Sequence, residues 1–377
     1  MNSLLQVLGR FGQILQNHLF PPLREELGEM SKHHEEFVRA LALLQMDGLV
    51  TVRRGRGRQP HDRAKIARAF LAKAIFQIPM TRALLDRLAH DAVLRRLCGW
   101  ETAAQIPDES IFSRAFAEFA RNEFPQQVHA AVIERTQSSR LVGHIMRDST
   151  AIEVREKPAP KPKPAVPAAR RLHRKAGTVK RPEQMTRLER QASGTMTVEE
   201  MLAELPRPCD YGCKLNSLGV KHRWPGFKLH VDVVDGQIPI SCVLTSASVN
   251  DMQVAIPLAL MSARRVTNLY DLLDTGYDCT AIREFSLSLG HVPIIPFQKR
   301  GSQQPPELAP HEKIRLRERT AVERVFSRLK DEYGAANVRV RGWAKVMAHL
   351  MFGILALTAD QIWRLGSVES PPSPVPG

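Results

Sequence analysis

The amino-acid sequence predicts an α/β protein in which an all-helical N-terminal domain precedes a mixed sheet flanked by helices. Three observations predict this fold class. Apolar residues recur at helical spacing through most of residues 1–140, short β-branched segments alternate with helical ones from residue 141, and 43% of the 377 residues are hydrophobic, enough for a sizeable core. We expect domains at 1–140 and 141–365, followed by a disordered Ser/Pro tail at 366–377.

The charge balance indicates a polyanionic partner. The chain carries 54 Lys and Arg against 39 Asp and Glu, a net charge of +15. Since neutralising phosphates releases counterions, nucleic acid is the simplest partner. The odd number of cysteines, 5, indicates reduced thiols in the cytoplasm. The apolar run at 350–359 is too short for a bilayer core of about 30 Å, so we expect a buried helix and no membrane partner.

The N-terminal region contains three clear helical segments, 66–76, 81–97 and 106–120. The last has an N-cap signal at Asp108 or Ser110. Before these helices, residues 52–63 are rich in Arg and Gly. Such a loop suits contact with the DNA backbone, although a solvated interdomain loop is the alternative. The candidate DNA-contacting residues are Arg53, Arg54, Arg56 and Arg58.

A strand is predicted at 141–154, around Asp148. It is followed by a basic, Pro-rich insertion at 155–190, which holds twelve Lys or Arg residues against three Glu. This composition is typical of an extended or disordered segment. A plain linker is one interpretation, but a plain linker needs no such charge, so we favour DNA contact.

Strands and helices alternate after the insertion. Two strands, 226–234 and 238–247, flank the hairpin signal Asp235-Gly236. A helix at 251–263 precedes a strand at 267–274, which ends in Asp274. A helix at 279–290, a strand at 292–297 and helices at 311–331 and 342–365 complete the predicted domain.

The helix predicted at 311–331 has three faces. Val322, Val325, Phe326 and Leu329 recur at the spacing of a buried face. Arg319, Glu323 and Lys330 form a charged stripe at the edge of that face. A carboxylate flanked by cations suits a metal ion beside a phosphate chain, although many ordinary surface helices have the same pattern.

Two carboxylates in strand context, Asp148 and Asp274, join Glu323 as candidate metal ligands. Phosphodiester chemistry needs an activated nucleophile and charge relief, which two Mg²⁺ ions held by carboxylates supply. Nearby acids compete less well. Asp271 would face the other side of its strand, Asp278 lies beyond a glycine turn, Glu153 is at odd spacing from Asp148, and Glu318 would fall on the apolar arc.

The sequence resembles bacterial insertion-sequence transposases of the IS-four-like group, which have a DDE catalytic domain of the ribonuclease-H-like fold. Their Tyr-x₂-Arg-x₃-Glu-x₆-Lys signature is matched by Arg319, Glu323 and Lys330, while Leu316 stands at the Tyr position. DTGYD at 274–278 resembles the second-Asp motif and RDST at 147–150 the first-Asp strand. WPGFKLH and LTSASVNDMQVAIPL resemble the middle strands of the group and the helix that follows them, and IPDESIFSRAFAEFA resembles the amino-terminal domain common to these transposases.

The resemblance implies Mg²⁺-dependent strand cleavage at element ends and attack of the freed 3′-hydroxyl on target DNA, with Mn²⁺ as a possible substitute. Asp148, Asp274 and Glu323 would hold two ions, and Arg319 and Lys330 would hold DNA phosphates. The partners would be terminal inverted repeats and target DNA, bound by a homodimer in the bacterial cytoplasm, at the nucleoid. An idle DNA-binding derivative and a stand-alone nuclease are the alternatives.

Two further patterns remain open. Lys228 alternates with His230 on one strand face and could contact DNA, but a structural role fits equally well. Cys209 and Cys213 with the two histidines His222 and His230 could bind zinc, but their spacing is irregular, and plain buried thiols are the better interpretation.

Overall fold

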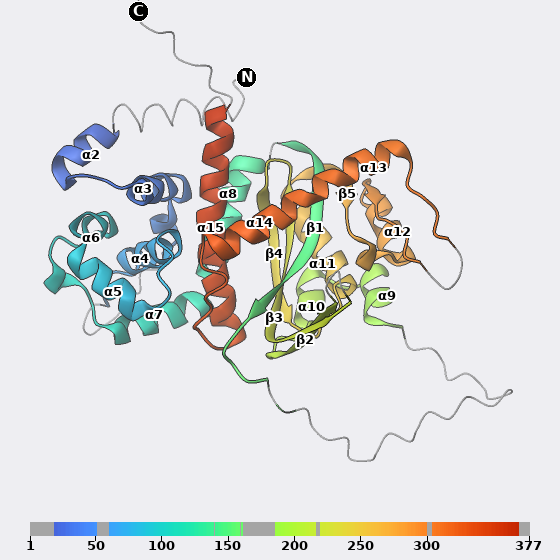
Figure 1. Ribbon diagram of the computed structural model, residues 1–377, viewed down its shortest axis with the longest axis horizontal. Coiled ribbons are helices and arrows are strands. Elements are labelled where there is room, and N and C mark those ends of the chain that lie inside the picture. The colour runs from blue at the N-terminus through green and yellow to red at the C-terminus, as the bar shows by residue number, and fades with distance from the viewer. Residues whose placement is uncertain are drawn as a thin grey trace, which may run out of the picture.

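A computed structural model describes residues 19–50, 60–138, 140–158, 160, 185–215, 219–299 and 304–368 (Figure 1). Arg53, Arg54, Arg56 and Arg58, most of the basic insertion and residues 369–377 of the predicted tail lie outside the described residues. Residues 366–368, which we assigned to the tail, instead form the end of the last helix.

The N-terminal region is helical, as predicted, and lies on the left of Figure 1. The segment predicted as one helix at 81–97 is two helices, because the Asp91 side chain accepts the amide of Leu94 at 2.9 Å and starts a new helix. The helix predicted from 106 begins at Glu109, with Asp108 as its N-cap residue. The helices are α2 (Phe20–Leu27), α3 (Lys32–Leu44), α4 (Arg63–Ile75), α5 (Thr81–His90), α6 (Ala92–Cys98), α7 (Glu109–Arg121) and α8 (Phe124–Gln137).

The sheet is mixed, and its central strand β1 (Leu141–Glu153) lies between β3 (Lys221–Val234) and β5 (Thr267–Leu272). β3 is antiparallel to β1 and to β4 (Ile238–Ser246), whereas β5 is parallel to β1 and to β6 (Val292–Ile294). The hairpin predicted at Asp235-Gly236 is confirmed. Helices α11 (Met252–Ala263) and α12 (Thr280–Ser288) follow the predicted order. This arrangement is consistent with the ribonuclease-H-like fold.

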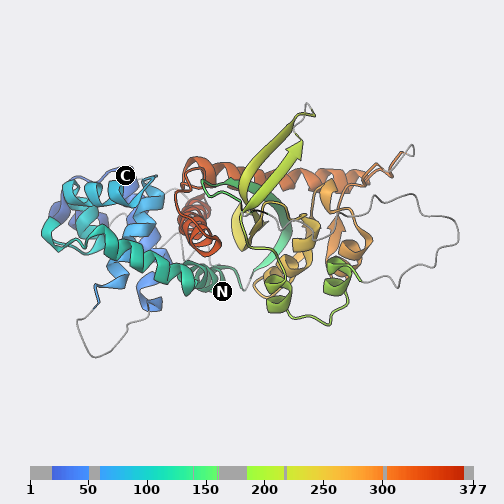
Figure 2. The ribbon, with the colours of Figure 1, turned by 90° about the horizontal axis from the view of Figure 1, so that it is seen from below.

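Three elements were not predicted. β2 (Asp210–Leu215) pairs with the first residues of β3, and the two strands project from the body of the molecule (Figure 2). α9 (Arg187–Ala192) shows that the extended conformation expected up to residue 190 is wrong for its last residues, since Thr186 and Glu189 form a capping box that starts a helix. α10 (Val198–Ala203) begins with a similar box at Thr197.

The helix predicted at 311–331 is interrupted. α13 (Pro310–Leu316) and α14 (Thr320–Asp331) are joined by a 3₁₀ turn, η5 (Arg317–Arg319). A 3₁₀ helix has about 3.0 residues per turn, whereas an α-helix has about 3.6. The turn therefore changes the direction in which the side chains of α13 point relative to those of α14. Glu318, expected on the apolar arc, is therefore exposed. The apolar face of α14 itself is confirmed, with Val322, Val325 and Leu329 buried.

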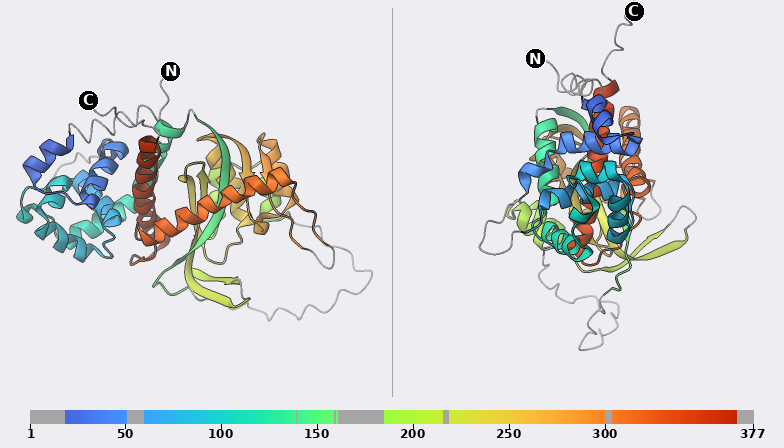
Figure 3. Two further views of the ribbon diagram at one scale, coloured as in Figure 1. Left: turned by 45° about the horizontal axis from the view of Figure 1, so that its top comes forward. Right: turned by 90° about the vertical axis from the view of Figure 1, so that its left-hand side faces the viewer.

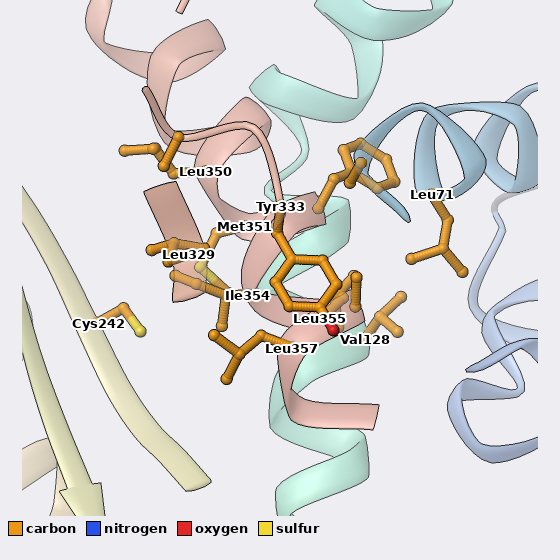
Figure 4. Packing of buried hydrophobic residues seen from close by; sticks show 14 of the residues in the cluster. Leu71, Val128, Cys242, Leu329, Tyr333, Leu350, Met351, Ile354, Leu355 and Leu357 are labelled. Atoms are coloured by element: carbon orange, nitrogen blue, oxygen red, sulfur yellow. The ribbon is translucent and has the colours of Figure 1, made fainter. Parts of the chain in front are cut away.

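Helix α15 (Trp343–Val368) connects the helical region to the sheet (Figure 3). Figure 4 shows its Met351, Ile354 and Leu355 between Leu71 on one side and Cys242 of β4 on the other. One apolar cluster contains residues of the N-terminal helices, of α15 and of the sheet. By length and composition alone Trp343–Gly366 could span a membrane, but 89% of its most apolar window is buried within the protein, so the predicted buried helix is confirmed.

Replacing Gly226 by Ala is expected to destabilise the sheet by about 2–4 kcal/mol. Gly226 has a φ of +152°, and an added Cβ would lie 2.1 Å from the carbonyl oxygen of Ile152 in the neighbouring strand. Urea denaturation measures the loss. Gly290→Ala is the matched control, because Gly290 also has a positive φ, +82°, but no atom close to the added Cβ. Equal losses in the two variants would contradict a steric cause.

Candidate active site

Asp148 and Asp274 lie side by side because of the strand register. Met146 of β1 is paired with Leu272 of parallel β5, and each aspartate follows two residues later. A backbone amide fixes each carboxylate. The Ser149 N–H donates to Asp148 Oδ1 at 2.7 Å, and the Gly276 N–H donates to Asp274 Oδ1 at 2.8 Å. The structure thus brings together two of the three predicted acids.

Glu323 approaches this pair through Arg319. Arg319 Nη1 donates to Asp148 Oδ2 at 3.1 Å, and Arg319 Nη2 donates to Glu323 Oε1 at 3.0 Å. Asp148 and Arg319 are largely buried, whereas the Glu323 side chain is 56% exposed. The charged stripe of α14 therefore faces β1, with Arg319 as the cation between two acids.

The electrostatics of the pair favour an added cation. Burial raises the pKa of Asp148 to about 6, and the charge of Asp274 adds to the increase. Burial also raises the pKa of Asp274, although the Gly276 amide and Arg319 oppose this. A divalent ion would relieve the same repulsion.

In the metal-free protein, Asp148→Asn is expected to increase stability at pH 7.5 by up to about 3 kcal/mol. The folded chain binds a proton at Asp148 more tightly than the unfolded chain does, because the pKa of this carboxyl is near 3.8 in the unfolded chain. This contribution to stability is fully present below about pH 4 and is lost as the pH rises through about 6. Urea denaturation in EDTA at pH 4 and 7.5 measures it. The same stability difference between variant and wild type at both pH values would contradict the raised pKa.

A fourth carboxylate, Asp251, was missed by the sequence analysis. It raises the pKa of both Asp148 and Asp274 and so lies within their electrostatic range. Its Oδ1 accepts a hydrogen bond from Lys228 Nζ at 2.9 Å. Asp251 follows a buried strand and precedes a helix, the same signal that identified Asp274.

Lys228 and His230 have partners within the protein. Lys228 Nζ also donates to the Val249 carbonyl at 2.8 Å, which favours the structural role over the DNA contact. His230 is buried beside Thr245 Oγ1 at 3.0 Å, and burial lowers its pKa to about 4. Lys330 is half-buried on α14, and burial lowers its pKa.

The competing acids lie elsewhere. Asp271 is buried, accepts hydrogen bonds from Asn268 and Ser286 and contacts His291, so it faces away from Asp148 as expected. Asp278 is bound by Arg283 and by the amide of Gln298. Glu153 is exposed, 3.8 Å from His222. Leu316, at the Tyr position of the signature, packs against the main core.

Carboxylates are the hard oxygen donors that Mg²⁺ and Mn²⁺ prefer, so the donor set fits these ions chemically. Among the described residues, however, no three His, Cys, Asp or Glu side chains form a ready metal site. The zinc pattern gains no support. Cys209 is buried with its thiol 3.5 Å from the Glu156 carbonyl, and Cys213 is exposed, so the buried-thiol prediction is wrong for Cys213.

The chain is thus a mixed α/β protein in which Asp148 and Asp274 lie together, just beyond the paired part of the parallel strands β1 and β5. Comparison with known families gives two matches. The family described as "Transposase DDE domain" matches residues 206–359, and the "Transposase domain (DUF772)" matches residues 13–118. The chain is accordingly an insertion-sequence transposase of the DDE class. The matches do not confirm the IS-four-like group, which stays a prediction. No curated protein and no solved structure matches the chain significantly.

Proposed function

We propose that this transposase cleaves DNA strands at the ends of its own element and joins the freed 3′-hydroxyl ends to target DNA. The observation that carries the proposal is the convergence of Asp148, Asp274 and Glu323 on Arg319 from distant parts of the chain. DDE transposase domains generally use divalent metals, and transposases act on DNA.

Asp148, Asp274 and Glu323 are the residues that would hold the ions, Mg²⁺ or Mn²⁺. Two bound ions supply an activated water or 3′-hydroxyl and charge relief at phosphorus and at the leaving oxygen. Arg319 forms ion pairs with both Asp148 and Glu323. Its planar guanidinium suits phosphate oxygens equally well. We assign Arg319 two alternating partners, these acids and a DNA phosphate.

The proposed DNA partners are the terminal inverted repeats and the target duplex, bound by a homodimer in the bacterial cytoplasm, at the nucleoid. The net charge of +15 supports a polyanionic partner. The test uses a labelled duplex that carries one element end, with Mg²⁺ or EDTA, and a supercoiled plasmid as target. Mg²⁺-dependent cleavage followed by joining to the plasmid is expected. Binding without cleavage would favour an idle DNA-binding protein, and cleavage without joining a nuclease.

Lys330→Ala is expected to weaken binding of the element end and to reduce the slope of log K against log salt by about one unit, because one phosphate contact is lost. Lys330 is half-buried on the helix that carries Glu323. Fluorescence anisotropy between 50 and 200 mM salt measures the slope, with the exposed Lys32→Ala as control. An unchanged slope would assign Lys330 to helix packing alone.

A further inference from the structure

A cavity of about 300 Å³ lies between the helical region and the end of α14, away from the carboxylates. Its walls come from α4, α7, α15 and the loop that joins α14 to α15. We call it the cationic cleft, after the charged side chains that line it: Lys73, Arg339, Arg341 and Lys345, with Glu109 as the one acid.

The four cations of the cleft have no hydrogen-bond or ion-pair partner among the described residues. Arg328, on α14 just before the cleft, is in contrast bound by Glu332 and Asp360. Burial lowers the pKa of Lys73 to about 8, and burial and the charge of Lys73 lower the pKa of His349 to about 4. Several unpaired cations around one cavity repel each other, so an anion bound there would be stabilised.

The loop that carries Arg339 and Arg341 is held at both ends. His349 Nε2 of α15 is 3.1 Å from the Gly334 carbonyl oxygen, and the Gly342 amide donates to Glu156 Oε2 at 2.7 Å. Tyr333, labelled in Figure 4, donates from its hydroxyl to Glu36 Oε1 of α3 at 3.0 Å. The cleft is therefore built between fixed elements, which limits the ordering cost of binding.

The cleft and the carboxylates lie along the same helix. Glu323 and Asp331 of α14 are separated by about 12 Å at 1.5 Å per residue, and the cleft begins at Tyr333. Duplex DNA carries one charge per about 1.7 Å of axis, so about 12 Å of duplex carries roughly seven phosphates. A duplex end that reaches the carboxylates is therefore long enough to extend as far as the cleft.

We propose that the cationic cleft binds the sugar-phosphate backbone of the element's end several nucleotides from the phosphate that is cleaved. This inference rests on the proposed function and extends it. The ligand is phosphodiester, held by Lys73 of the helical region together with Arg339, Arg341 and Lys345 from the C-terminal part of the chain. DNA then bridges two parts of the protein that share one apolar core.

The test compares a double variant, Arg341→Gln with Lys345→Gln, with a matched double control, Lys32→Gln with Arg121→Gln. Both controls are exposed cations of the helical region that do not line the cleft. A labelled duplex of the element's end is the probe. The cleft variant is expected to bind about tenfold more weakly at 200 mM salt and to lose about two units of salt slope. The control should stay within twofold of the wild type.

Ethylation of single phosphates locates the contact. In the wild type, ethylation at phosphates several nucleotides from the cleavage site should interfere with binding, and the cleft variant should lose this interference at those positions alone. Arg341→Lys should retain the wild-type slope.

An unchanged slope and interference pattern in the cleft variant, with cleavage intact, overturn the cleft inference but leave the proposed function. Weakened binding in the cleft variant, with a wild type that never cleaves, supports the cleft and contradicts the proposed function. A wild type that does not bind the duplex overturns both.

Discussion

Asp148→Asn, Asp274→Asn and Glu323→Gln are each expected to reduce Mg²⁺-dependent strand cleavage by about a thousandfold or more, roughly 4 kcal/mol of transition-state stabilisation. Each change keeps the shape of the side chain but removes one negative charge from the set that would hold the ions. Binding of the element end should remain within a few-fold of the wild type, because these acids do not attract phosphates. Gel-based cleavage of a labelled end, with anisotropy for binding, separates the two effects.

Glu318→Gln is the matched control for Glu323→Gln. Glu318 is exposed in the turn that precedes α14 and is adjacent in sequence to Arg319. Among the described residues it has no contact with Asp148. It should cleave at nearly the wild-type rate. Full activity in any one of the three site variants would remove that residue from the metal centre.

Asp232→Ala is expected to lower the free energy of unfolding by about 3–5 kcal/mol. Asp232 and Arg147 form a buried pair across β1 and β3, with both side chains at most 3% exposed. Arg147 donates to both carboxylate oxygens, at 2.8 and 2.7 Å, and Ser262 donates to Asp232 at 2.7 Å. Removing the acid leaves the buried Arg147 guanidinium without its paired carboxylate, and Asp271 is then the nearby acid that remains. Urea denaturation measures the loss.

A double variant tests the origin of that loss. Arg147→Met combined with Asp232→Leu removes both charges, so its stability should lie much closer to that of the wild type. The pair of Arg96 and Glu101 is the surface control, because the Glu101 side chain is 67% exposed, and Glu101→Ala should change stability little. If the double variant is as unstable as Asp232→Ala, packing rather than charge is responsible. Arg147 precedes Asp148 in β1, so the pair also fixes the strand that carries the site.

The sequence predicted those features that local patterns encode. Asp148 was placed in a strand because the segment around it is short and β-branched, and Asp274 was placed at the end of the strand predicted at 267–274. The parallel register brings the two together. The buried face of α14 and the Asp235-Gly236 hairpin followed from helical spacing and turn chemistry. Asp271 was assigned to the opposite face of its strand by the period of two, and its buried partners agree.

Features set by tertiary contacts were not predictable in this way. No Gly or Pro marks the 3₁₀ turn at Arg317–Arg319, where Arg319 contacts the acids on β1 and α14. β2 was missed although Tyr211, Cys213 and Leu215 recur at the spacing of a strand, and it pairs with the extended start of β3. Asp251 comes near the site only when β4 and α11 fold against the sheet. Lys228, which we had considered for DNA contact, is paired with Asp251 instead.

The central claim is that Asp148, Asp274 and Glu323 hold the metal ions in the DNA complex. Fe²⁺-directed cleavage of the polypeptide tests it most directly, because iron bound in place of Mg²⁺ generates radicals that cut the nearby backbone. On the complex with the element's end, we expect cuts near residues 148, 274 and 323, suppressed by excess Mg²⁺ and absent in Glu323→Gln. Cuts confined to other parts of the chain, or unchanged in that variant, would contradict the account.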